Sequence, residues 1–243
     1  MFCITGYNAI EEYLKAGKFK GRLLFSRRGG RIERLLFLSK KTGIPLKKTS
    51  SEELDRISKN KEHRGVLLIV EEGDQRGNIS LKNFLKYFQK EKALILLLDG
   101  ITDPQNYGSI LRSADQFYVD LVIIRTRRAV GFSQAVAKAS SGADQYVPIS
   151  VNTNLNMCIE LLKSSGFWVY GADVSGENIW NMDFKGKVAI VMGSEGGGLS
   201  RLVRESCDYL VKIPACGHID SFNVSVAAGI LMYEVRRQHQ CFS

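Results

Sequence analysis

Apolar and polar positions along the chain follow two periods, and the changes between them predict the order of helices and strands. Short, nearly continuous apolar runs are typical of buried strands. After residue 80 they lie at 93–99, 120–124, 167–173 and 188–193, with a shorter run at 209–214. Stretches with helical spacing separate these runs. Such alternation predicts an α/β fold with a parallel sheet covered on both faces. The last segment, 224–237, is apolar almost all round and predicts a buried helix.

The first seventy residues predict a smaller α/β unit, in which helical and strand patterns alternate. One helix is expected to end at Gly43, a residue type that favours the left-handed C-terminal position, with Pro45 just beyond it. Glycines and charges without apolar periodicity then fill 72–80, which predicts a linker. We therefore expect two domains, 1–71 and 81–243, joined by that linker.

Composition narrows the class of protein. Hydrophobic residues make up 44% and charged residues 24% of the 243 residues, which excludes disordered, collagen-like and coiled-coil chains. The longest unbroken apolar run, 93–98, is far shorter than the roughly 20 residues that a membrane helix needs. The N-terminus shows no secretory signal. We therefore expect a soluble protein of the cytoplasm with no membrane partner.

The cysteines and histidines are scattered. The five cysteines form no CxxC pair, and the three histidines form no HExxH motif. An odd number of unclustered cysteines favours reduced thiols. Packing or surface roles are expected for these side chains, and no metal site is expected.

Positive charge is concentrated near the N-terminus. Residues 1–71 carry sixteen Lys and Arg against eight Asp and Glu, whereas 72–243 carry eighteen against seventeen. Between Lys15 and Lys48 there are twelve basic residues and one acid, Glu33. This asymmetry favours a polyanion such as nucleic acid as the partner. The alternative is a solvated basic face that maintains solubility.

Ligands of parallel α/β sheets bind at the carboxyl ends of the strands, and three polar loops are expected there. In the first, Asp103 can cap a helix that has Pro104 at its first position. Asn106 then lies in the first turn, and Arg112 follows in the same helix. An amide near a helix N-terminus and a guanidinium beyond it suit a phosphate or a ribose. A capped helix with one surface arginine is the structural alternative.

The second loop, 193–200, places four glycines around Glu195. Glycines allow a ligand to approach the backbone closely. The loop matches neither a GxGxxG fingerprint nor a Walker A sequence, and a flexible turn is the alternative. The third loop, 217–223, precedes the apolar helix. Its Ser221 and Asn223, with Ser225 just beyond, are small polar residues for which helix capping is the first interpretation.

Taken in order, these loops resemble the signature of the SpoU branch of the SPOUT RNA methyltransferases, the TrmH-like enzymes. The family's first motif, DPxNxGxxxRxA, is met from Asp103 to Ala114. The second, GSEGxGLS, is met from Gly193 to Ser200, and the third, IPxxGxxxSxNVSVAxG, from Ile213 to Gly229. The family usually has glycine after Phe117, where this chain has Tyr118, and we expect that position to serve packing at the end of the helix.

The resemblance also covers the N-terminus. The segments ITGYNAIEEYL and HRGVLLIV resemble the small substrate-binding domain, of a fold shared with some ribosomal proteins, that precedes many SpoU enzymes. The basic domain 1–71 is therefore expected to bind RNA, and 81–243 to be the methyltransferase domain. The resemblance further implies a C-terminal trefoil knot, an exception to the rule that folds are unknotted, and a homodimer.

The resemblance implies that the donor is S-adenosylmethionine and the acceptor a ribose 2′-hydroxyl in RNA, without a metal. Length and domain order match most closely the subgroup that methylates a guanosine of 23S rRNA, and tRNA is the alternative substrate. The family's positions imply a catalytic set and a set that contacts the cofactor. The catalytic set is Asn106, Arg112, Glu195, Ser221 and Asn223, and the cofactor set is Gly193, Ile213 and Phe222.

Two other classes of protein are alternatives to an enzyme of this family. The first is a catalytically silent RNA-binding or ribosome-assembly protein, which would be expected to have lost some of the catalytic set. All five residues of that set are present. The second is a nicotinamide-dependent dehydrogenase, which the absence of GxGxxG disfavours.

Overall fold

A computed structural model describes residues 2–17, 19–58, 62–71, 79–126, 133–219 and 221–241. The expected linker, 72–80, lies mostly outside these residues. The strands are β1 (Phe2–Ile4), β2 (Gly21–Phe25), β3 (Leu46–Lys48), β4 (Val66–Val70), β5 (Ala93–Leu98), β6 (Leu121–Arg125), β7 (Ile149–Asn152), β8 (Trp168–Asn178), β9 (Lys187–Met192) and β10 (Tyr209–Lys212). The helices are α1 (Tyr7–Ala16), α2 (Arg31–Lys41), α3 (Ser51–Ser58), α4 (Leu81–Tyr87), α5 (Pro104–Gln116), α6 (Gln134–Ala139), α7 (Leu155–Ser164), α8 (Arg201–Ser206) and α9 (Val224–His239), with 3₁₀ turns η1 (Ala143–Gln145) and η2 (Ile179–Asn181).

The chain forms two compact units. The first comprises Met1–Gly77 and Gly131–Tyr146, and the second Asn78–Val130 and Val147–Ser243. In the first unit a sheet of order β1-β4-β2-β3 places β4 antiparallel to both β1 and β2. All five residues of β4 are buried, because α1 and α2 contribute to a core on one face of the sheet and α3 to a smaller core on the other.

The segment Gly131–Tyr146 joins the first unit through a buried carboxylate. Asp144 is almost fully buried, and it accepts hydrogen bonds from the Tyr13 hydroxyl at 2.5 Å, from Ser140 Oγ at 2.7 Å and from Gln145 Nε2 at 3.0 Å. Burial of a carboxylate is tolerated when hydrogen bonds satisfy its oxygens. The domains expected from the sequence, 1–71 and 81–243, would place this segment in the second domain, whereas the structure groups it with the first unit. The expected domains remain our proposal for the two functional domains.

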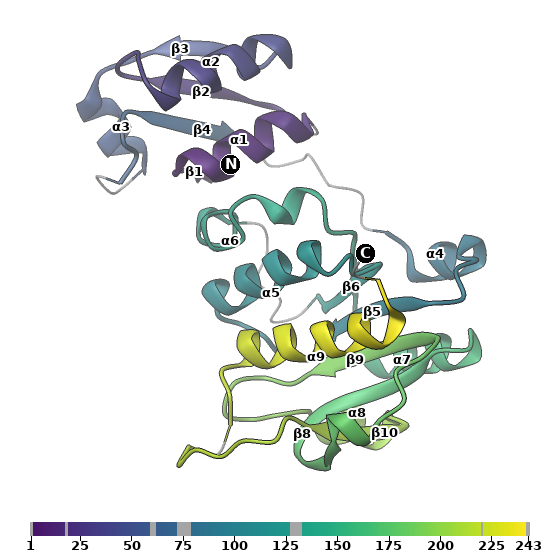
Figure 1. The fold of residues 1–243 in the computed structure, drawn as a ribbon. Coiled ribbons are helices and arrows are strands. Elements are labelled where there is room, and N and C mark those ends of the chain that lie inside the picture. Colours follow the sequence, from purple (N-terminus) through teal and green to yellow (C-terminus); the bar gives the residue numbers. More distant parts are fainter. Residues whose placement is uncertain are drawn as a thin grey trace. The chain divides into compact units, whose positions relative to one another are not determined.

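The second unit is built on a six-stranded sheet of order β10-β8-β9-β5-β6-β7, in which every neighbouring pair is parallel. Helices α5 and α9 lie side by side on this unit (Figure 1). On one face, α4, α7 and α8 bury apolar residues against the sheet. The predicted parallel sheet is therefore confirmed. Its order brings β9 and β5 to the centre, where both strands are almost wholly buried.

The predicted strands all form, but the structure adds some that the pattern did not reveal. Strands β1, β3 and β7 are only three or four residues long and carry too few apolar positions for a visible period. Strand β8 continues to Asn178, beyond the expected end at 173, because β10 pairs with it across a register shift between Leu210 and Val211. Short strands of this kind depend on their sheet neighbours rather than on local sequence.

The expectation that the last helix is buried rather than on the surface holds for one of its faces only. One face of α9 is buried, including Leu231, Met232 and Val235. The other lies along a groove shared with α5, where Val226 and Tyr233 are each 50% exposed. The helix is fixed at its far end by the buried Arg236, whose guanidinium donates to the Phe117 carbonyl at 2.7 Å.

Tyr118 does not have the expected packing role. Its side chain is 84% exposed, and its backbone takes a positive φ of 47° just past the end of α5. Residues with a Cβ atom are strained in this left-handed conformation, whereas glycine is not. The usual glycine of the family therefore suits the backbone at this position, and Tyr118 adopts the same turn at an energetic cost.

Replacing Tyr118 by glycine is expected to stabilise the protein by about 0.5–1 kcal/mol, since relief of strain exceeds the added entropy of the unfolded chain. For a chain of this length that raises the midpoint of thermal unfolding by about 1–4 °C. Tyr118→Ala is the matched control, because it removes the ring but keeps the Cβ atom. Equal stabilisation by alanine and glycine would show that the ring, and not the backbone, is the source of the cost.

Candidate active site

Three loops leave the carboxyl edge of the second unit's sheet, after β5, β9 and β10. The first is set by Asp103, whose carboxylate accepts the Asn106 N–H at 2.9 Å and so caps α5, with Pro104 at the first helical position. The predicted cap is therefore confirmed. Because Asn106 lies within the first turn, its side chain is held at the helix N-terminus, and the residue is buried.

The second loop is a closed turn. Ser194 and Gly198 exchange backbone hydrogen bonds of 2.9 and 3.0 Å. A Cβ atom at Gly193 would lie 2.2 Å from the Gly198 carbonyl carbon, so glycine is required there by the turn itself. Glu195 stands exposed at the tip. The glycines thus hold a carboxylate in a defined position, which argues against the alternative of a merely flexible turn.

Sequence analysis missed the role of Asp99, which comes directly after β5. Its buried carboxylate accepts the Ser200 N–H at 2.8 Å and so ties the end of the second loop to the end of the central strand. A carboxylate that directly follows a buried apolar strand is the signal that could have found it. This hydrogen bond satisfies one oxygen of the buried side chain.

The third loop ends at Asn223, which caps α9. Its Oδ1 accepts hydrogen bonds from the Ser225 and Val226 N–H groups at 2.9 and 3.4 Å and from Ser225 Oγ at 2.6 Å. The capping interpretation is therefore confirmed for Asn223. Because the oxygen is occupied by the helix, the amide nitrogen must point away from it, and this orientation gives the residue a second contact.

One chain of hydrogen bonds links the three loops. Asn223 Nδ2 donates to Asn106 Oδ1 at 2.9 Å, and Asn106 Nδ2 donates to Glu195 Oε2 at 2.9 Å. The cap fixes the orientation of the Asn223 amide, because its oxygen must face the N–H groups of α9. Its nitrogen is then the donor to Asn106, and the Asn106 nitrogen is in turn the donor to Glu195. Asn106 and Glu195 are 89 positions apart in the sequence, and Asn106 and Asn223 are 117 apart, yet the hydrogen bonds hold all three side chains together. We refer to these three side chains as the amide–carboxylate network.

Arg112 and Ser221, the other two candidates for the catalytic set, are exposed and stand outside the network. Arg112 follows Ser109 by three residues on α5, so the two are neighbours on the helix surface. Ser109 lines the groove between α5 and α9. An exposed guanidinium at this position is available to a phosphate or to a developing negative charge.

The three cofactor candidates lie on the loops that follow β9 and β10. Gly193 directly follows β9, and Ile213 directly follows β10 and is half-buried. Phe222 is 40% exposed and precedes the Asn223 cap. Partly uncovered apolar side chains in a loop at the sheet edge fit a ligand that carries an aromatic base, as S-adenosylmethionine does.

Two of the cysteines, Cys158 and Cys207, are shielded by the fold of the second unit. Burial raises the pKa of the Cys158 thiol to about 11 and that of Cys207 to about 12. Both thiols are therefore protonated at neutral pH and are poor nucleophiles. Within the described ranges, no group of three or more His, Cys, Asp or Glu side chains is arranged to hold a metal ion.

A hydrogen-bonded network at the carboxyl edge of a parallel sheet is typical of a ligand site in an α/β enzyme. The excess of basic over acidic residues in 1–71 favours a nucleic acid as its partner. Residues 93–233 match the SpoU rRNA Methylase family, and residues 3–75 match the RNA 2′-O ribose methyltransferase substrate-binding family. The chain belongs to the SpoU rRNA Methylase family. It is an RNA methyltransferase that uses S-adenosylmethionine.

Individual relatives agree with this assignment. The chain is 42% identical, over 221 residues, to an uncharacterised tRNA/rRNA methyltransferase of Borreliella burgdorferi, covering 88% of this chain and 97% of the relative. It is 39% identical to YacO of Bacillus subtilis, which is assigned to the TrmH family of tRNA/rRNA methyltransferases, covering 97% of this chain and 95% of YacO. The resemblance that the three motifs carry is thus confirmed.

A solved structure also resembles the whole chain. It is the SpoU methyltransferase AviRb of Streptomyces viridochromogenes in complex with AdoMet, with a TM-score of 0.82 and 25% identity, covering 98% of this chain and 90% of AviRb. No helix in the described part of the chain is both long and apolar enough to cross a membrane.

Proposed function

We propose that this enzyme methylates a ribose 2′-hydroxyl, on a guanosine of 23S rRNA, in the cytoplasm as part of rRNA processing. The observation that carries the proposal is the amide–carboxylate network, which joins one residue from each of the three family motifs in a single chain of hydrogen bonds. An RNA-binding protein without catalysis would have no need to hold these side chains in one orientation.

The network's part in the reaction is to position. Asn106 uses its amide nitrogen toward Glu195 and its oxygen toward Asn223, so the side chain cannot rotate. Glu195 acts as a positioning residue for Asn106, and Asn223 fixes the other end through the α9 cap. A rigid, preorganised polar group lowers the cost of aligning the ribose with the methyl donor.

Arg112 and Ser221 complete the set at the solvent side. A guanidinium stays protonated at neutral pH and is a poor base. Arg112 is therefore assigned to holding a phosphate next to the target ribose and to stabilising the alkoxide that develops as the hydroxyl loses its proton. Ser221, one residue before Phe222 on the same loop, is assigned to a hydrogen bond with the bound substrates.

S-adenosylmethionine supplies an electrophilic methyl group on a sulfonium. Gly193, Ile213 and Phe222 are the residues that we assign to holding it, through the backbone of the second loop and the apolar side chains of the third. The transfer forms a carbon–oxygen bond to the ribose and breaks the carbon–sulfur bond. The hydroxyl proton leaves to solvent, and the chain's task is to orient that hydroxyl while its charge changes.

The first unit is assigned to holding the RNA by its phosphates. Its surface carries Arg27, Arg28, Lys47 and Lys48, all exposed. Affinity is therefore expected to fall steeply with salt. Deleting 1–71 would be a poor test, because Asp144 would lose its Tyr13 partner, so charge-neutralising surface variants are preferable.

The second candidate substrate is tRNA. The relatives from Borreliella burgdorferi and Bacillus subtilis are named as tRNA/rRNA methyltransferases, and these names include both classes of RNA. The additional basic unit favours rRNA, because it offers a large phosphate-binding surface outside the methyltransferase domain.

We also propose a homodimer and a trefoil knot. The dimer is supported by the groove between α5 and α9, whose lining includes the exposed Val226 and Tyr233 and the apolar Ile230. The knot is supported by the chain's membership of the SpoU family, whose resemblance implies it. Light scattering should give about twice the chain mass of 27.2 kDa.

The experiment that tests the proposed function is transfer of a labelled methyl group from S-adenosylmethionine to unmodified 23S rRNA and, in parallel, to total tRNA. Resistance of the modified ribose to alkali then maps the product. Incorporation at one guanosine of 23S rRNA is expected. Incorporation into tRNA alone would select the second candidate, and RNA binding without transfer to naked RNA or to ribosomal particles would indicate a silent RNA-binding protein.

A further inference from the structure

We propose that the outward face of α2, in the first unit, binds an unpaired RNA base by stacking it on Phe37. The helix buries Ile32, Leu35, Leu36 and Ser39 in the core of this unit. Phe37 lies on the opposite face and is 67% exposed. Most of this flat apolar side chain is left uncovered by the described part of the chain. The inference rests on the proposed function in taking RNA as the partner.

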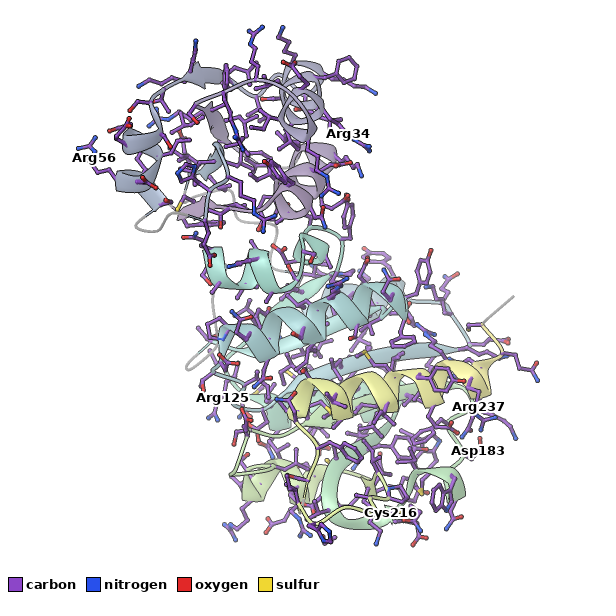
Figure 2. All side chains as sticks on the ribbon, turned by 60° about the vertical axis from the view of Figure 1, so that its left-hand side comes forward. Arg34, Arg56, Arg125, Asp183, Cys216 and Arg237 are labelled. Atoms are coloured by element: carbon purple, nitrogen blue, oxygen red, sulfur yellow. The ribbon has the colours of Figure 1, made fainter. Side chains whose placement is uncertain are left out.

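The residues around Phe37 carry the charge that a nucleic acid requires. The residues three and four positions away from Phe37 lie one helical turn before and after it. They are Arg34, Lys40, Lys41 and one acid, Glu33. Arg34 pairs with Glu11 at 2.6 Å, yet its side chain is 67% exposed, and it retains donors for a further acceptor. Figure 2 shows Arg34 at the surface of this unit. Three cations are thus grouped about a single aromatic ring.

This arrangement fits single-stranded RNA better than an apolar protein surface. Bound single strands combine base stacking on aromatic rings with phosphate contacts from Lys and Arg. A protein partner would require further apolar side chains beside Phe37, but its neighbours are charged. Tyr146 is the other large apolar residue exposed in the described part of this unit, and its hydroxyl donates to Glu12 at 2.7 Å. Phe37 has no polar atom that would explain its exposure in this way.

The test compares full-length variants for binding to a labelled single strand of about 12 nucleotides and to its duplex, by fluorescence anisotropy. Phe37→Ala is expected to weaken single-strand binding about 10–100-fold and to leave duplex binding unchanged. Phe37→Tyr keeps the ring and should bind as the parent protein does. Phe37→Leu keeps apolar area without the ring and should behave like alanine. Tyr87→Ala, at an aromatic residue of the second unit that is 74% exposed, is the matched control and should not change binding.

The salt dependence separates the ring from the charges. Phe37→Ala should keep the slope of log affinity against log salt, whereas Arg34→Gln and Lys41→Gln should each reduce it by about 0.7. Wild-type affinity of Phe37→Leu, or equal losses for single strand and duplex in Phe37→Ala, would overturn the proposal. Methyl transfer is scored separately. If binding depends on the Phe37 ring but no methyl group is transferred, the stacking site is upheld and the proposed function is rejected. If methyl transfer occurs but binding does not depend on the ring, the proposed function is upheld and the stacking site is rejected.

Discussion

Asn223→Asp is expected to fold normally and to lose about 10²–10³-fold in kcat/KM for methyl transfer. Aspartate is as good an N-cap as asparagine, and its charge suits the helix N-terminus. It has no donor for Asn106, however, and it would place a carboxylate oxygen where a 2.9 Å hydrogen bond now reaches Asn106 Oδ1. Two acceptors cannot share that position, so the Asn106 amide must turn and break its contact with Glu195.

Asn223→Ala separates the two roles of this residue. It removes both the donor and the cap, so the same loss of activity should be accompanied by a loss of stability of about 0.5–2 kcal/mol. In a chain of this length that lowers the midpoint of thermal unfolding by about 1–8 °C, whereas the aspartate variant should unfold within about 1 °C of the parent.

Steady-state kinetics with RNA as the varied substrate, together with thermal unfolding monitored by circular dichroism, measure both quantities. If Asn223→Asp turned over as fast as the parent protein, the network would have no part in catalysis, and Asn223 would be only a cap. If Asn223→Asp unfolded as early as Asn223→Ala, the loss of activity could be assigned to the fold and the positioning role would be rejected.

The second unit's sheet was predictable because its central strands are long apolar runs, such as Ala93–Leu98, that admit few other placements. The short strand β7 was not predictable, because the segment ISVN is only four residues long and too short to show a strand period. Segment Gly131–Tyr146 escaped prediction for another reason. Its docking combines the buried Ala137 with hydrogen bonds of Gln134 and Asp144 to distant residues, and nothing in the local pattern marks these side chains as buried or paired.

The site shows the same division. The resemblance to the family's motifs implied Asn106, Glu195 and Asn223 as catalytic candidates. The local sequence predicted Asp103 as a cap, because caps depend on neighbours along the chain. Their mutual hydrogen bonds join separate loops and were beyond the reach of any local rule. From the sequence, capping and function are alternatives for Asn223. In the structure one amide can serve both, since the cap uses its oxygen and the network its nitrogen.

Arg112→Ala is expected to lower kcat/KM by about 10³-fold while leaving the fold intact, because the side chain is exposed and caps nothing. Arg112→Lys should recover part of that loss, since it keeps the charge but not the planar fork of donors. Arg237→Lys is the matched control, an exposed arginine in the last turn of α9 that pairs with Glu234 at 2.7 Å. It should leave turnover unchanged.

The pH profile distinguishes charge stabilisation from proton removal by Arg112. If the guanidinium stabilises the developing alkoxide, the ratio of Arg112→Lys activity to that of the parent protein should stay constant between about pH 6.5 and 9, where an ordinary lysine remains charged. If the group must accept a proton, a lysine loses its own far more readily than an arginine. The variant's activity would then climb steeply with pH and reach the parent value, and Arg112 would have to be reassigned as the base.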